Sequence, residues 1–148
     1  MQRVLVVDDD EAVRRLVHYV LKHAGYEVVL AVDGREALVL LDESFDALLC
    51  DKNLPFVPGT AVVLEARARY PKLTTVLMTA APEALSLSSL GLDGYLAKPF
   101  RSTALVVHTL KAAIMRRQQP QPSAPQPLAK KPSTEVVAST PILPSRRN

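Results

Sequence analysis

The sequence contains a single cysteine, Cys50, and no tryptophan among its 148 residues. One cysteine excludes an internal disulfide, and its place in an apolar run predicts that Cys50 is a small core side chain. No apolar run approaches the ~20 residues that a membrane-spanning helix needs, and the short apolar stretch at the amino terminus does not match a secretory signal. These absences predict a cytoplasmic chain without a membrane span.

Net charge is also lacking over most of the chain. Residues 1–118 carry 14 Lys and Arg against 14 Asp and Glu, whereas residues 119–148 carry 4 against 1. Because the basic excess lies in the C-terminal segment, the first 118 residues show no sign of direct nucleic-acid binding. Seven of the 12 prolines also fall in the last 30 residues, among serines and glutamines. The composition predicts a folded domain over 1–118 and a disordered, basic, Pro/Ser/Gln-rich tail over 119–148.

Short apolar runs alternate with segments of helical periodicity in the first 118 residues. The expected strands are 4–7, 27–31, 47–50, 74–78 and 95–97. The expected helices are 13–24, ended by Gly25, one opened by Asp33-Gly34, 60–70, a short one within 80–90, and 101–117. Pro82 and three serines leave the fourth helix room for about two turns. This alternation predicts an α/β fold with a doubly wound parallel sheet and right-handed crossovers.

Reactive polar residues stand at the carboxyl ends of four of these strands. They are Asp8 and Asp9, Asp51, Thr79 and Lys98. In an open α/β sheet ligands bind outside the carboxyl ends of the strands, so these side chains should share one crevice. Three neighbouring carboxylates repel one another unless a cation neutralises them, and hard oxygen ligands suit Mg²⁺.

The same constellation predicts phosphoryl transfer, which needs mostly positioning and charge neutralisation. Lys98 supplies a cation for phosphoryl oxygens and Thr79 supplies a hydroxyl. Asp51 is the natural nucleophile because it stands alone on a central strand, whereas Asp8 and Asp9 form a pair suited to the metal.

Five short motifs, in this order and each at a predicted strand end, carry a resemblance to a known family. They are Leu5-Val6-Val7-Asp8-Asp9-Asp10, Asp51-Lys52-Asn53-Leu54-Pro55 with Gly59, Thr79-Ala80, Gly94-Tyr95 and Lys98-Pro99-Phe100. Over about residues 2–117 the chain resembles the receiver domain of bacterial two-component response regulators. The resemblance implies a five-stranded parallel sheet of order 2-1-3-4-5, the flavodoxin-like receiver fold, here with a shortened fourth helix.

The resemblance also assigns the site. It implies that Asp51 is the phosphoacceptor, and that Asp8, Asp9, Asp51 and the main-chain carbonyl of Asn53 bind Mg²⁺.

It further implies that Lys98 contacts the phosphoryl group and that the Lys98–Pro99 bond is cis. Thr79 and Tyr95 correspond to the pair of switch residues that rearrange on phosphorylation.

The function that follows is a phosphorylation-switched response regulator in a two-component phosphorelay. It would accept its phosphoryl group from a sensor histidine kinase or a phosphotransfer protein, signal to a downstream protein, and not act as an enzyme. No output domain is visible after the last predicted helix. Because the interval from Thr79 to Gly91 is about one helical turn shorter than usual for the family, we expect a monomer or a weak dimer.

Two other functions fit parts of the pattern. A phosphatase of the haloacid-dehalogenase type shares the Asp8-Asp9-Asp10 strand end, but that chemistry needs acids after the lysine, and none occurs between Asp93 and Glu135. A scaffold that binds partners without phosphorylation would not need the acids, Thr79 and Lys98. The three histidines, His18, His23 and His108, have no metal-ligand spacing and are expected on surfaces or in packing.

Overall fold

The computed structural model describes residues 1–82 and 87–119. The predicted tail therefore lies, apart from Gln119, outside the described residues, and so do residues 83–86 in the region of the expected short helix. No helix within the described ranges is both long and apolar enough to cross a membrane.

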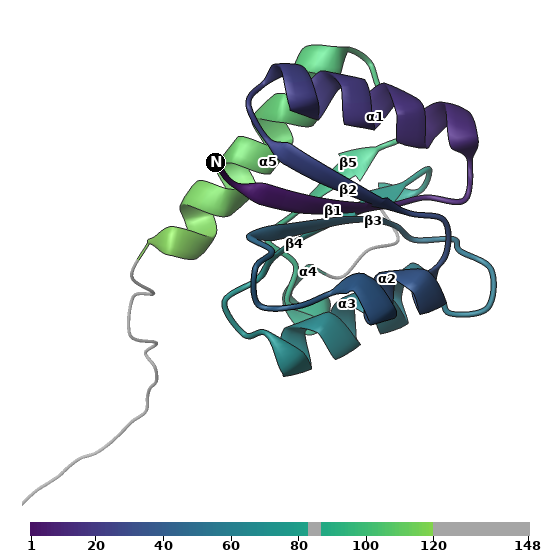
Figure 1. Ribbon diagram of the computed structural model, residues 1–148, viewed down its shortest axis with the longest axis vertical. Coiled ribbons are helices and arrows are strands. Elements are labelled where there is room, and N and C mark those ends of the chain that lie inside the picture. The colour runs from purple at the N-terminus through teal and green to yellow at the C-terminus, as the bar shows by residue number, and fades with distance from the viewer. Residues whose placement is uncertain (83–86, 120–148) are drawn as a thin grey trace, which may run out of the picture. The chain divides into compact units, whose positions relative to one another are not determined.

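Five parallel strands alternate with helices along the described chain (Figure 1). The strands are β1 (Arg3–Val7), β2 (Glu27–Ala31), β3 (Ala47–Asp51), β4 (Thr74–Thr79) and β5 (Gly94–Ala97). The helices are α1 (Glu11–His23), α2 (Gly34–Leu40), α3 (Gly59–Arg69), α4 (Leu87–Leu90) and α5 (Thr103–Gln118). The strand order is β2-β1-β3-β4-β5, which confirms the predicted doubly wound sheet.

Helices cover both faces of the sheet: α1 and α5 lie on one face, and α2, α3 and α4 on the other (Figure 1). The strands read as continuous apolar runs because a parallel sheet is buried on both faces. Alternate β1 residues serve the two sides, since Val4 and Val6 pack with the α1 and α5 core, while Leu5 and Val7 pack with the α2 and α3 core.

Most element boundaries follow local signals. The Asp10 side chain caps α1 by accepting from the backbone of Ala12 and Val13, a role for which aspartate is among the preferred residues. Gly25, with φ +99°, ends α1 as predicted. The expected start of the last helix at 101 was two residues early, because α5 begins at Thr103.

The end of α2 depends on another helix. Arg69 at the end of α3 donates to the carbonyl of Leu38 at 2.9 Å, and the Tyr70 hydroxyl donates to the carbonyl of Leu41 at 3.3 Å. These bonds satisfy carbonyls that the last turn of a helix leaves without partners.

Candidate functional site

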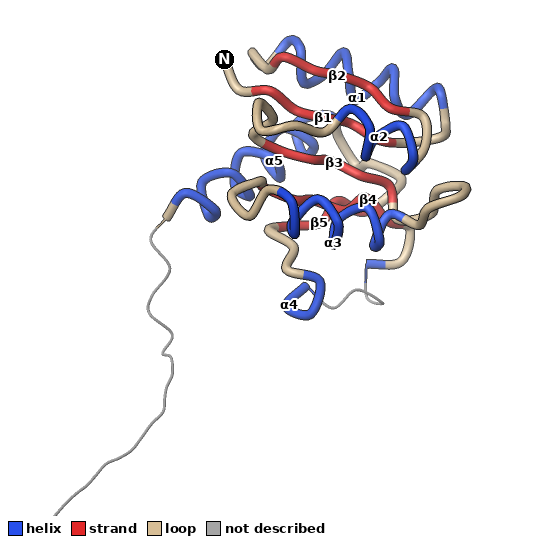
Figure 2. Tube along the Cα trace, turned by 60° about the horizontal axis from the view of Figure 1, so that its bottom comes forward, coloured by secondary structure: helices blue, strands red, loops and turns tan. Residues whose placement is uncertain are grey.

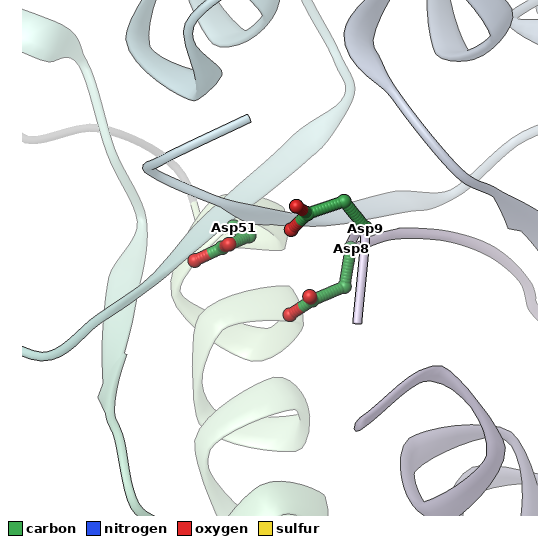
Figure 3. Close-up of side chains that lie close together, drawn as sticks. All are labelled: Asp8, Asp9 and Asp51. Carbon is green, nitrogen blue, oxygen red and sulfur yellow. The ribbon is translucent and has the colours of Figure 1, made fainter. Parts of the chain in front are cut away.

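The three predicted acids meet at the carboxyl edge of the sheet (Figure 3). Strands β1 and β3 are neighbours, and Val7 pairs in register with Cys50, so Asp8 and Asp51 come side by side. Ligand oxygens of Asp8, Asp9 and Asp51 all lie within 4.8 Å of one another. Asp8 is fully buried and Asp51 is 6% exposed, whereas Asp9 is exposed.

One ammonium group joins this cluster from the residue that follows β5. The Lys98 Nζ lies 2.9 Å from Asp8 Oδ2 and 3.4 Å from Asp51 Oδ1. The backbone holds Lys98 in place, since its N–H donates to the carbonyl of Thr79 at 2.8 Å. The Lys98–Pro99 bond is cis, as the resemblance implied. One cation against three carboxylates leaves the cluster two negative charges in excess.

Burial and the neighbouring charges shift two pKa values in this cluster. Burial and the nearby charge of Asp8 raise the pKa of Asp51, and Lys98 offsets this only in part. Burial by itself would lower the pKa of Lys98, but its hydrogen bond and charge interactions with Asp8 and Asp51 raise it instead. Lys98 therefore stays protonated, while Asp51 ionises less readily than an ordinary aspartate.

Asp8 is fixed by protein donors on three sides. Its Oδ1 accepts from the backbone of Asp10 at 2.9 Å, and its Oδ2 accepts from Lys98. Its carbonyl accepts from Arg14 Nη1 at 2.7 Å. Arg14 was missed from the sequence, because its partner is a main-chain carbonyl and such an acceptor leaves no mark in the residue pattern.

The loop after β3 fixes the main chain around Asp51. The Gly59 N–H donates to the carbonyl of Lys52 at 2.8 Å, and a Cβ on Gly59 would stand 2.0 Å from the Asp51 carbonyl oxygen. Only glycine permits so close an approach. Asn53, whose main-chain carbonyl was predicted to bind metal, lies in this loop with an exposed side chain.

The two predicted switch residues occupy different surroundings. Thr79 at the end of β4 is buried, and its hydroxyl oxygen accepts from the backbone of Ala81 at 3.0 Å. That bond leaves the hydroxyl hydrogen free to be donated elsewhere. Tyr95 is 43% exposed and lines a cavity between β5 and α5.

The cysteine and the histidines lie outside the acidic cluster, in the core or on helices. Cys50 is buried, as expected, and burial, followed by the charges of Asp51 and Asp8, raises the pKa of its thiol, so it is not a nucleophile. His23 stacks on Tyr19 with ring centroids 4.1 Å apart. His108 is exposed on α5.

Comparison with known proteins matches residues 4–110 to the response regulator receiver domain family. Among curated relatives, the transcriptional regulatory protein CpxR of Klebsiella pneumoniae is 37% identical over 120 residues, covering 79% of this chain and 50% of that protein. The response regulator MprA of Mycolicibacterium vanbaalenii is 37% identical over 126 residues, covering 82% and 54%. The chain therefore spans about half the length of these relatives.

Solved structures agree with this match. The chemotaxis response regulator CheY4 of Vibrio cholerae superposes with a TM-score of 0.69 at 32% identity, covering 76% of this chain and 98% of that one. The response regulator TrrA of Thermotoga maritima, in complex with Mg²⁺-BeF, superposes with a TM-score of 0.64 at 31% identity, covering 76% and 99%.

Proposed function

The chain belongs to the family of response regulator receiver domains, and from that premise we propose that it is switched by a phosphoryl group on Asp51. The proposed donor is a sensor histidine kinase or a phosphotransfer protein, and the proposed reader is a downstream protein. One observation carries the proposal: the Asp51 carboxylate, at the end of β3, lies beside two further carboxylates and 3.4 Å from the Lys98 ammonium.

The residues present fit a divalent cation. Three carboxylates with hard oxygen donors face a single ammonium, and two negative charges remain uncompensated. We propose that Asp8, Asp9, Asp51 and the main-chain carbonyl of Asn53 hold Mg²⁺. When bound, the ion would neutralise charge between the acceptor carboxylate and the incoming phosphoryl oxygens. The TrrA complex with Mg²⁺-BeF supports this proposal from a relative.

The side chains then have separate tasks. An Asp51 carboxylate oxygen forms the new bond to phosphorus while the bond from phosphorus to the donor breaks. Lys98, now shared between Asp8 and Asp51, would pair with a phosphoryl oxygen. The hydroxyl of Thr79 would donate its free hydrogen to another. Moving Thr79 in this way is the proposed link to Tyr95, which lines the neighbouring surface cavity.

Phosphoryl uptake tests the assignment of Asp51. Full-length protein treated with acetyl phosphate and Mg²⁺ should gain the mass of one phosphoryl group, and the Asp51→Asn variant should gain none. Asp46→Asn is a matched control, because Asp46 is an exposed acid at the opposite edge of the sheet. Equal labelling of the parent and the Asp51→Asn variant would contradict the proposal, and no labelling of the parent would favour a phosphorylation-independent scaffold.

A second experiment tests the proposed link from the site to the surface. Beryllofluoride with Mg²⁺ mimics the phosphoryl group and should shift the amide resonances around Tyr95 in the parent. In Lys98→Ala and Thr79→Ala those shifts should be largely lost, because the side chains that sense the new oxygens are gone. Lys111→Ala, an exposed change on α5, should keep the parent pattern. Undiminished shifts near Tyr95 in both site variants would rule out the link.

A further inference from the structure

The net charge of zero over the first 118 residues hides a separation of charge within the folded domain. Residues 27–43 carry five acids against one arginine, and residues 93–117 carry one acid against five Lys and Arg. The first segment holds β2 and α2, and the second holds β5 and α5. Because β2 and β5 are the two edge strands (Figure 2), the acidic and basic segments lie toward opposite sides of the molecule.

The acidic side presents apolar side chains together with its charge. On α2, Val39 is 84% exposed and Leu40 is 36% exposed. The exposed acids Glu36 and Glu43 flank them. These four residues are called the α2 ridge. Two cations near the ridge are already engaged. The Arg35 guanidinium stacks on the Phe56 ring 3.5 Å away and lies 3.9 Å from Asp33, and Arg69, which donates to the Leu38 carbonyl, pairs with Glu65 at 2.8 Å.

The basic side contains a cavity whose apolar and positively charged lining is complementary to the apolar and acidic α2 ridge. A cavity of about 910 Å³ opens between β5 and α5 and is called the α5 groove. Its lining includes the apolar side chains of Tyr95, Leu105 and Ala112 and the cations Arg101 and Arg116. The one acid of the lining, Asp93, is buried and is ion-paired with arginines, so it offsets little of the positive charge at the rim.

We propose that the α2 ridge of one copy of the chain docks in the α5 groove of a second copy. Val39 and Leu40 would enter the apolar hollow, while Glu36 and Glu43 would approach Arg101 and Arg116. A second copy is the favoured occupant because the chain itself carries both complementary surfaces, a ridge with exposed acids and a groove lined by Arg101 and Arg116. Each copy in such a contact keeps one free ridge and one free groove, so the association is head to tail and can extend.

The contact is small and its charges are exposed, so the association is weak. Exposed ion pairs are screened by salt, and an interface of this kind falls at the low end of specific contacts. Dimers of the full-length protein should therefore form at concentrations of roughly 0.1–1 mM at low ionic strength. They should dissociate as salt is raised. Sedimentation of the parent that is monomeric throughout this range would overturn the proposal.

Two apolar-to-acidic variants test which surfaces meet. Val39→Asp removes a functional ridge and Leu105→Asp removes a functional groove, so each variant alone should be monomeric at the highest concentration. An equimolar mixture should form dimers that do not grow further, because the groove of the first variant accepts the ridge of the second. A mixture that stays monomeric would overturn the proposal. Association that is lost in Leu105→Asp but retained in Val39→Asp would also overturn it, because that result indicates a groove-to-groove dimer.

A charge exchange then tests the electrostatic part. Glu43→Lys and Arg101→Glu should each weaken association about tenfold, and the double variant should recover much of the loss because the opposite charges again face each other. Lys22→Glu, an exposed change on α1, serves as the control and should associate like the parent. A double variant that associates no better than the single variants would contradict the proposed pairing.

Discussion

Two charge clusters lie at the two opposite ends of the parallel strands. At the carboxyl edge, Asp8, Asp9 and Asp51 face one cation, Lys98. At the amino edge the cations outnumber the acid instead. Asp93, just before β5, lies 3.8 Å from both Arg67 and Arg117 and accepts the backbone N–H of Thr75 at 2.9 Å.

The excess charges of the two clusters are offset to different extents by neighbouring groups. At the amino edge the arginines have further acceptors, because Arg67 also donates to the carbonyl of Gly91 and Arg117 to that of Pro71. At the carboxyl edge, Lys98 pairs with Asp8 and Asp51, and among the described residues the Asp9 carboxylate has no ion pair. The amino-edge cluster is thus complete by itself and structural, whereas the carboxyl-edge cluster is suited to receive a cation and a phosphoryl group.

Removing the central acid of the complete cluster should have the largest effect on stability. Asp93→Ala leaves two partly buried arginines without their carboxylate and frees the Thr75 N–H, so it should cost about 3 kcal/mol of unfolding free energy. Urea denaturation measures the change. Asp46→Ala, at an exposed acid of the same edge, should cost under about 1 kcal/mol. Equal midpoints for the Asp93 variant and the parent would show that the cluster is not structural.

At the carboxyl-edge cluster, a bound cation should instead stabilise the folded protein. Millimolar Mg²⁺ should raise the unfolding free energy of the parent by about 1–2 kcal/mol, since it binds only the folded chain. The gain should disappear in Asp9→Ala, which loses the exposed carboxylate of the cluster. It should persist in Asp93→Ala above that variant's lower baseline. Thermal melts with and without Mg²⁺ decide the point, and equal gains in the parent and Asp9→Ala would refute it.

The smallest expected effect is a gain in the free energy of unfolding when one acid of the carboxyl-edge cluster is removed. Without metal, Asp51→Asn should raise the unfolding free energy by about 1 kcal/mol near pH 7, because it removes a carboxylate charge that burial and the repulsion of Asp8 disfavour. The folded-state pKa of Asp51 is raised, so its ionised form costs stability above that pKa. The cost fades as pH falls through it, since the folded state then takes up the proton more readily than the unfolded state.

The advantage of Asp51→Asn over the parent should therefore be largest near neutral pH and shrink toward acid pH. Denaturation midpoints of both proteins across this range measure the difference. A stability difference that stays constant, or that grows on acidification, would contradict the raised pKa of Asp51.

Much of the fold and of the candidate site could be predicted from local patterns. The apolar runs of β1 and β3 end at Asp8 and Asp51 because a parallel strand is buried until it reaches the edge of the sheet. The same reasoning located Thr79 and Lys98. Tyr95 was named only through the family resemblance, and the structure places it in the α5 groove.

Contacts with main-chain carbonyls could not be predicted. Arg14 reaches the carbonyl of Asp8, and Arg69 reaches that of Leu38. Every residue has a carbonyl, so the partner of such a donor is selected by three-dimensional position and not by residue type.

The sequence alone determined which residues form strands and helices, because apolar periodicity and caps act within a few positions. It also determined which reactive side chains end the strands. Only the tertiary structure decided that Lys98 bonds Asp8 across 90 positions, and that Asp93 collects arginines from α3 and α5. The strand order likewise turned a neutral composition into two oppositely charged sides. These features depend on which elements become neighbours, and long-range packing of the whole chain sets that arrangement.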